Sequence, residues 1–174
     1  MEDFETIKND NNVFFQKKQN SYNEYRVISS HSLTKSTNII DIVRNNALFD
    51  LIYQLNSDLI IEYKNKNNII KYVFSSDIMK EFGDSFALKI SNSVNVISDN
   101  DCIITGASVP YNNNKYSNIF FLNNLNIVFN ISNNTFNVIF SYNIDNNKFN
   151  NREIELVSNF LTKIVSKLNA YVCN

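Results

Sequence analysis

The feature that most constrains the fold is a two-residue alternation between residues 125 and 144, in which apolar side chains alternate with mostly polar ones. Ser132-Asn133-Asn134 interrupts the alternation once, near its middle. Period two is typical of a β-strand that turns one face to a core. We therefore predict two antiparallel strands with an apolar face in the core and a more exposed, Asn-lined face. The apolar positions are Leu125, Ile127, Phe129, Ile131, Phe136, Val138, Phe140, Tyr142 and Ile144.

A helical pattern follows over residues 151–172. Its apolar stripe contains Ile154, Val157, Leu161, Ile164, Leu168 and Val172. Asn150 and Glu153 have the spacing of a capping box, and Glu153 and Glu155 lie where the helix dipole favours negative charge. We predict an amphipathic helix that covers the apolar face of the preceding strands.

The remaining chain suggests an α+β domain. The spacing of apolar residues predicts a helix over 38–56 and a short helix and loop over 76–90. Two segments rich in β-branched and aromatic residues, 59–63 and 69–74, are predicted to pair as a hairpin. Short strands are expected at 94–97 and 102–104, the second ending where Gly106 to Pro110 begins. Residues 1–35 are interpreted as an N-terminal arm or extension. Residues 36–174 then form one domain, an antiparallel sheet of about five to six strands flanked by an opening and a closing helix.

Asparagine is unusually abundant, with 34 residues against 2 Gly and 1 Pro. Its codons are A/T-rich, which indicates a low-GC genome. Its side chain tolerates the left-handed backbone conformation better than most, so we expect Asn at the turns where glycine would otherwise stand.

A family resemblance rests on the strand Phe136–Ser141, a short loop and the segment Phe149-Asn150-Asn151-Arg152-Glu153 that opens the last helix. Residues 136–172 resemble the closing segment of a GAF domain in detail, and 38–172 resemble it in outline. The resemblance implies a profilin-like sensory fold. The family's bilin-holding Cys and His and its cyclic-nucleotide motif are absent, so no site residue is carried over and a cofactor-binding set stays unknown. Roadblock-like dimerisation modules share the same element order.

Few residues offer catalytic chemistry. His31 is the only histidine and is a candidate base for a Cys102 thiol. We interpret Cys102 as a small buried apolar residue, His31 as a surface side chain, and Cys102 and Cys173 as free thiols. One His and two Cys do not supply four zinc ligands, so no metal is expected.

Other polar patterns have structural explanations. Asp99 and Asp101 alternate like calcium ligands, but the chain continues directly into an apolar run, so we predict a turn. Glu153 and Glu155 do not face each other on a helix, which argues against paired-carboxylate catalysis. Gly83 and Gly106 stand outside any phosphate-loop frame.

Composition excludes several function classes. The net charge is −1, with no lysine or arginine block suited to duplex nucleic acid. No apolar run approaches the roughly 18 residues of a membrane span, and the polar start is unlike a signal peptide. We expect a cytoplasmic, intracellular and reducing location.

The sequence favours a non-catalytic interaction or regulatory module that acts through a protein partner or a homodimer, as a subunit of a larger assembly. The arm at 1–35 and the outward-facing Val128 and Ile139 suggest such contacts. A small-ligand-sensing GAF-like domain is the alternative. A cysteine-dependent enzyme that brings together His31, Cys102 and a carboxylate is a second alternative. No cofactor is expected.

Overall fold

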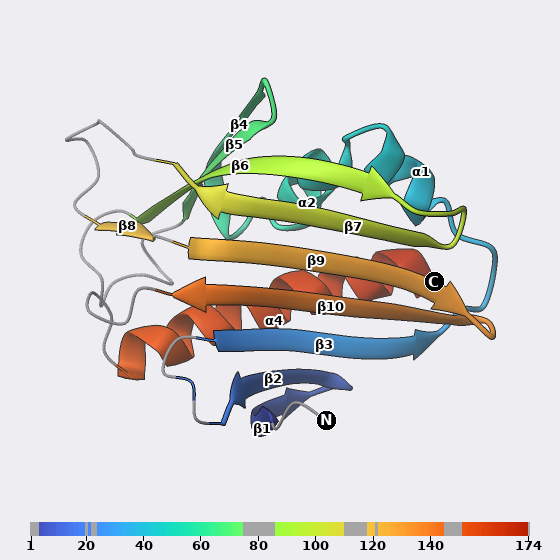
Figure 1. Ribbon diagram of the computed structural model, residues 1–174, viewed down its shortest axis with the longest axis horizontal. Coiled ribbons are helices and arrows are strands. Elements are labelled where there is room, and N and C mark those ends of the chain that lie inside the picture. The colour runs from blue at the N-terminus through green and yellow to red at the C-terminus, as the bar shows by residue number, and fades with distance from the viewer. Residues whose placement is uncertain are drawn as a thin grey trace.

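The computed structural model describes residues 4–19, 21, 24–74, 86–109, 118–120, 122–144 and 151–173. In these residues one large twisted sheet is covered on one face by helices (Figure 1). Nine strands follow the order β1-β2-β3-β10-β9-β7-β6-β5-β4 with antiparallel neighbours, and β8 pairs with β6 in parallel. The strands are β1 (Phe4–Asp10), β2 (Val13–Lys18), β3 (Glu24–Ser32), β4 (Ile60–Lys66), β5 (Ile69–Phe74), β6 (Phe86–Val96), β7 (Asp101–Ser108), β8 (Asn118–Phe120), β9 (Leu122–Ser132) and β10 (Thr135–Ile144).

The hairpin predicted from period two is confirmed. Strands β9 and β10 pair from Thr135 opposite Ser132 to Ile144 opposite Leu122, and Phe136, Val138 and Tyr142 are buried. The turn falls at Asn133 and Asn134, with φ of 49° and 58°. All the non-glycine residues of the described chain with positive φ are asparagines, as expected of Asn in glycine's place: Asn11, Asn12, Asn46, Asn67, Asn68, Asn133 and Asn134.

The segment expected to be an N-terminal arm contributes to the sheet. Residues 4–10, 13–18 and 24–32 form β1, β2 and β3, and β3 pairs with β10 from Ser32 opposite Thr135 to Glu24 opposite Asn143. On β3, every second side chain points inward, and these residues, Tyr25, Val27 and Ser29, are buried. The segment therefore supplies an inner strand and one edge of the sheet, which differs from a detached extension.

The sheet is larger than the five to six strands expected. The short apolar pieces at 94–97 and 102–104 belong to long strands, β6 and β7. Residues 86–90, placed in a short helix and loop by the sequence pattern, begin β6, whereas 76–85 lie outside the described residues. Gly106 lies within β7, where a Cβ would stand 2.9 Å from the Ser91 carbonyl oxygen, so close strand approach explains this glycine.

The first predicted helix is present but divided. Residues 38–56 contain α1 (Ile39–Arg44) and α2 (Leu48–Leu55). Asn46 between them has φ of 56°, which a continuous helix does not accept. The hairpin of 59–63 with 69–74 is confirmed as β4 and β5, turning at Asn67 and Asn68.

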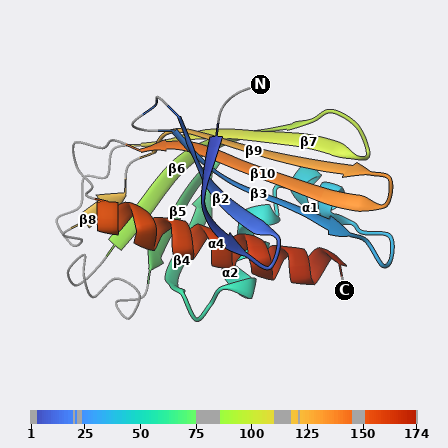
Figure 2. The same cartoon turned by 90° about the horizontal axis from the view of Figure 1, so that it is seen from below.

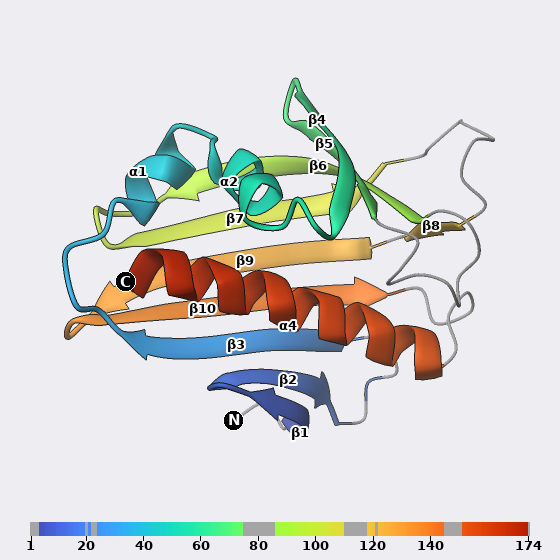
Figure 3. The same cartoon turned by 180° about the vertical axis from the view of Figure 1, so that it is seen from behind.

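The closing helix α4 (Asn151–Cys173) crosses the inner face of the sheet, as the apolar stripe predicts (Figures 2 and 3). Ile164 and Leu168 are buried in the same core as Phe136 and Val138 of β10, and Phe140 packs against that core. Helices α1 and α2 lie beside α4 over the strands β6 and β7 (Figure 3). Within the described residues, the core is thus the layer between one sheet and the helices α1, α2 and α4.

Candidate apolar ligand site

An apolar cavity of about 50 Å³ lies within the layer between the sheet and the helices. Its wall comes from α2, β5, β6, β9, β10 and the first half of α4. The lining residues are Phe49, Ile52, Tyr72, Phe74, Leu88, Ile90, Leu122, Leu125, Phe140, Val157, Phe160, Leu161 and Ile164. Tyr72 is the one lining residue with a polar side-chain group. Its hydroxyl donates a hydrogen bond to the Phe49 carbonyl oxygen at 2.8 Å, so this group is satisfied inside the wall.

Aromatic rings form one side of the cavity. Tyr63 stacks on Tyr72 with ring centroids 5.3 Å apart, and Phe74 meets Phe160 of α4 edge-on at 4.4 Å. Burial raises the pKa of Tyr72 well above its ordinary value, and burial, followed by the nearby Asp50 carboxylate, raises the pKa of Tyr63. Both phenols therefore stay neutral near neutral pH, and the wall carries no charge from them.

The interface between α4 and the strands β2 and β3 has a different character. Hydroxyl and amide side chains gather there, and several of their buried atoms lack a hydrogen-bond partner in the structure. These atoms are His31 Nε2, Thr162 Oγ1, Ser166 Oγ and Asn169 Nδ2, and Tyr142 Oη on the neighbouring β10 lacks a partner as well. A surface groove of about 410 Å³ opens at its end, beside His31, Asn169 and Cys173. Polar atoms without partners are places where protein interiors hold water.

His31 and Cys102 are not brought together. They lie on β3 and β7, which are separated by β10 and β9. Three inter-strand steps at roughly 4.8 Å each place them on the order of 14 Å apart, beyond the reach of a proton transfer. Burial raises the pKa of the Cys102 thiol to about 11, which disfavours the thiolate. His31 instead shares the surface groove with Cys173, whose pKa is also raised by burial.

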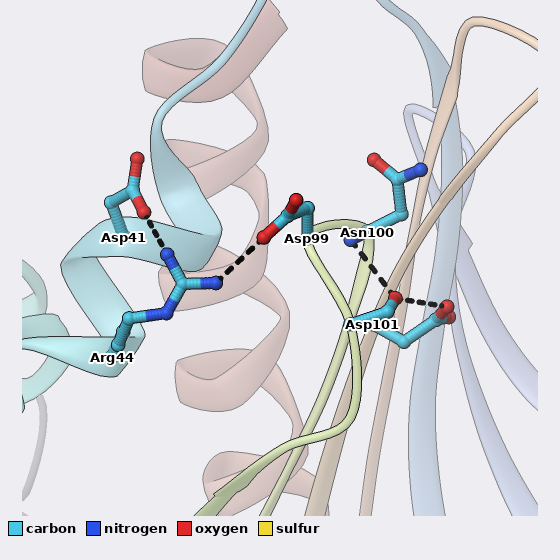
Figure 4. A network of polar contacts seen from close by, with 6 residues as sticks. Asp41, Arg44, Asp99, Asn100 and Asp101 are labelled. Atoms are coloured by element: carbon cyan, nitrogen blue, oxygen red, sulfur yellow. Dashed lines mark hydrogen bonds and ion pairs between the residues drawn. The ribbon is translucent and has the colours of Figure 1, made fainter.

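Asp99 lies in the turn between β6 and β7, Asp101 is the first residue of β7, and other side chains contact both (Figure 4). The Arg44 guanidinium contacts the Asp99 carboxylate at 2.9 Å. The Ser98 hydroxyl donates to Asp101 at 2.9 Å, and Asn130 donates to the same carboxylate. These contacts join α1 and β9 to the turn, and the described residues contain no group of three or more potential metal ligands.

The remaining predicted site residues take no part in the cavity. Glu155 is exposed on α4, and the side chain of Glu153 lies outside the described residues, as does Gly83. Within the described part of the chain, no helix has the length and apolar character needed to cross a membrane.

The fold of this chain is similar to solved structures of StAR-related lipid transfer proteins. Human STARD10 aligns with 95% of this chain and 73% of its own at a TM-score of 0.64 and 10% identity. Human StAR-related lipid transfer protein 5 aligns over 96% of this chain and 83% of its own, with a TM-score of 0.58 and 9% identity. The human StarD13 lipid transfer and protein localization domain also has a TM-score of 0.58, at 9% identity, over 83% of this chain and 76% of its own. No family model and no curated protein sequence matches the chain.

These similarities correct the family prediction. The GAF-like and roadblock-like assignments are wrong, because the structural neighbours are StAR-related domains with a much larger sheet. The segment 136–172 misled because a β-strand followed by an amphipathic helix is common to many folds. The interpretation as a protein-interaction module or assembly subunit is contradicted too, because the neighbours are lipid transfer proteins. That finding agrees better with the small-ligand alternative.

Proposed function

We propose that this protein binds an apolar small molecule, or the tail of an amphipathic lipid, in the cavity between the sheet and α4. The observation that carries this proposal is a wall that presents apolar surface from six elements and whose one hydroxyl is already paired. Water in such a space lacks hydrogen-bond partners, whereas a hydrocarbon gains about 25 cal/mol for each Å² removed from water.

The size of the cavity adds a condition. A space of about 50 Å³ holds a few heavy atoms, which is less than the roughly 150 Å³ that accommodates benzene in an engineered site. A longer ligand therefore enters only if the walls separate. The strands are joined by backbone hydrogen bonds, whereas α2 and α4 rest on the sheet through side chains. The helices are thus the walls that yield most easily.

The structural neighbours support the same class of ligand. Their names describe lipid transfer, and the shared fold reaches across nearly the whole of this chain. For this chain we propose binding of an apolar ligand, with transfer between membranes as its physiological use.

A fluorescent polyene fatty acid, cis-parinaric acid, tests the proposal by its emission increase in an apolar site. The variant Leu161→Trp places an indole where a cavity-lining side chain stands. Leu156→Trp is the matched control, because Leu156 is also half-buried on α4 but does not line the cavity. Circular dichroism verifies that both variants fold.

We expect saturable binding by the unmodified protein, an affinity at least tenfold lower for Leu161→Trp, and a change below twofold for Leu156→Trp. Equal affinities in the two folded variants, or no saturable binding by the unmodified protein, would contradict the proposed function.

A further inference from the structure

Lysines form a row across three strands on the outer face of the sheet. Lys64 of β4 lies directly opposite Lys71 of β5, and Lys71 lies directly opposite Lys89 of β6. Lys66, two positions along β4, joins these three residues around a surface groove of about 280 Å³. Directly opposed side chains stand about 5 Å apart at Cβ, and like charges in that arrangement destabilise a sheet.

The two lysines of β4 are the exposed part of the row. The Glu62 carboxylate accepts a hydrogen bond from the Lys71 ammonium at 2.6 Å and lies 3.8 Å from the Lys64 ammonium. The Lys64 side chain is 74% exposed, and Lys66 is exposed as well. The two lysines of β4 therefore present their ammonium groups to solvent at an edge of the sheet. Two exposed ammonium groups on one strand favour contact with a negatively charged surface.

The row lies on the back of the cavity wall. Side chains alternate across a strand, so Lys71 is flanked along β5 by the inward-facing Tyr72 and Lys89 along β6 by Leu88 and Ile90. Tyr72, Leu88 and Ile90 all line the apolar cavity. One thickness of sheet thus separates the basic groove from the candidate ligand site.

We propose that the face formed by Lys64, Lys66, Lys71 and Lys89 docks the protein on an anionic lipid surface. The inference rests on the proposed function, because a protein that binds an apolar molecule must meet the membrane in which that molecule dissolves. Ile61, on the same edge strand, is 62% exposed. Clustered lysines are typical of surfaces that bind anionic lipid.

The residues of the groove fit a membrane better than a nucleic acid. Single-stranded nucleic acids are held by aromatic side chains that stack on bases. The groove is lined by Lys64, Lys66, Asn67, Ile69, Lys71 and Lys89, which include no aromatic residue. The aromatic residues of the same strands, Tyr63, Tyr72 and Phe74, form the ring series on the inner face.

Vesicle sedimentation tests the proposal with phosphatidylcholine vesicles that contain about one third phosphatidylserine. The test variant is Lys64→Glu with Lys66→Glu, which reverses two exposed charges. The control is Lys35→Glu with Lys163→Glu, which changes the net charge equally at exposed positions away from the groove. Each lysine near such a surface is worth about fivefold in affinity, so the test variant loses about 25-fold or more. The control changes less than threefold, and pure phosphatidylcholine vesicles bind weakly.

Equal losses in the two double variants would overturn the proposal, as would undetectable binding of the unmodified protein to the anionic vesicles. Tighter binding to a poly-dT oligonucleotide than to vesicles would replace it with nucleic-acid binding. The parinaric acid assay, run without vesicles on the same variants, separates the two hypotheses. Normal fatty-acid binding with no vesicle binding removes docking alone, whereas vesicle binding with no fatty-acid binding removes the proposed function alone.

Discussion

The two sides of α4 rest on the same sheet but differ in chemistry. Toward β5, β6 and β9, Val157, Phe160 and Ile164 face a wall of aliphatic and aromatic side chains with a small space between them. Toward β2 and β3, Thr162 and Asn169 are buried, and the hydroxyl of one and the amide nitrogen of the other lack a partner. We call these the apolar side and the polar side of α4.

The comparison shows where a ligand gains most. On the polar side, Asn169 accepts a weak hydrogen bond from Ser29 at 3.4 Å, and its other neighbours leave polar groups that a polar partner could still pair with. On the apolar side, neither water nor a polar ligand finds a hydrogen-bond partner. Only apolar atoms gain free energy by filling the cavity. The apolar side is therefore the side that we propose as the binding site, and the polar side attaches the helix to β2 and β3.

The largest effect is expected from Phe160→Ala on the apolar side. Phe160 is 9% exposed and meets Phe74 at 4.4 Å, so its removal enlarges the cavity and lowers the free energy of unfolding by about 3–5 kcal/mol. Urea denaturation measures the change. Because the enlarged cavity holds more ligand, decanoic acid should restore more stability to this variant than to the unmodified protein. A loss below about 1 kcal/mol would show that the apolar side is not tightly packed.

Two buried tyrosines allow a matched test of paired and unpaired hydroxyls. The Tyr72 hydroxyl donates to Phe49, whereas the Tyr142 hydroxyl has no partner in the structure. Tyr72→Phe leaves a buried carbonyl unsatisfied and should lower the free energy of unfolding by about 1–2 kcal/mol. Tyr142→Phe removes an unpaired group and should change stability by less than about 0.5 kcal/mol or raise it. Equal losses from the two substitutions would mean that Tyr142 has a partner in solution.

Alkaline pH should weaken the core that both sides share. Burial raises the pKa values of Tyr72 and Tyr142, and that of Cys102 to about 11. The unfolded chain therefore loses these protons at lower pH than the folded chain does. The stability is complete below about pH 8, where the groups are neutral in both states, and declines as pH rises toward 11 and beyond. Urea midpoints between pH 8 and 11 measure the decline, which should be shallower for Cys102→Ala. A midpoint that rises over this range would contradict the burial of these groups.

The smallest effect is expected on the polar side. Thr162 is 1% exposed and its hydroxyl is unpaired, so Thr162→Val, of the same shape, should stabilise the protein by up to about 1 kcal/mol. Ser158→Ala is the control, because the Ser158 hydroxyl donates to the Glu155 carbonyl oxygen at 2.6 Å within the same helix. A destabilisation by Thr162→Val of more than about 1 kcal/mol would identify a well-bonded water at this hydroxyl.

Local patterns in the sequence predicted the elements whose structure is decided locally. The alternation at 125–144 and the helical stripe at 151–172 gave β9, β10 and α4 close to their true bounds. Asparagine pairs indicated turns, because a turn residue with positive φ must itself tolerate that backbone conformation.

What the sequence did not reveal depends on pairings between distant residues. Strand β3 joins β10, more than 100 residues away, and its inward positions change from Tyr25 and Val27 to Ser29 and His31, which hides the alternation. The fold and the cavity were missed for the same reason: the lining residues come from six elements, and in the sequence each one resembles ordinary core. The cross-strand lysines of β4, β5 and β6 align only when the register is known.

A methyl NMR titration with decanoic acid, below its aggregation concentration, tests the central claim most directly. The isoleucines provide reporters on both faces of the molecule. Ile52, Ile90 and Ile164 line the cavity, whereas Ile61, Ile97 and Ile139 are exposed elsewhere. We predict saturable shifts of the three cavity methyl signals and little change of the exposed ones. Shifts confined to the exposed isoleucines would show that the fatty acid binds on the surface and that the apolar side of α4 is not a ligand site.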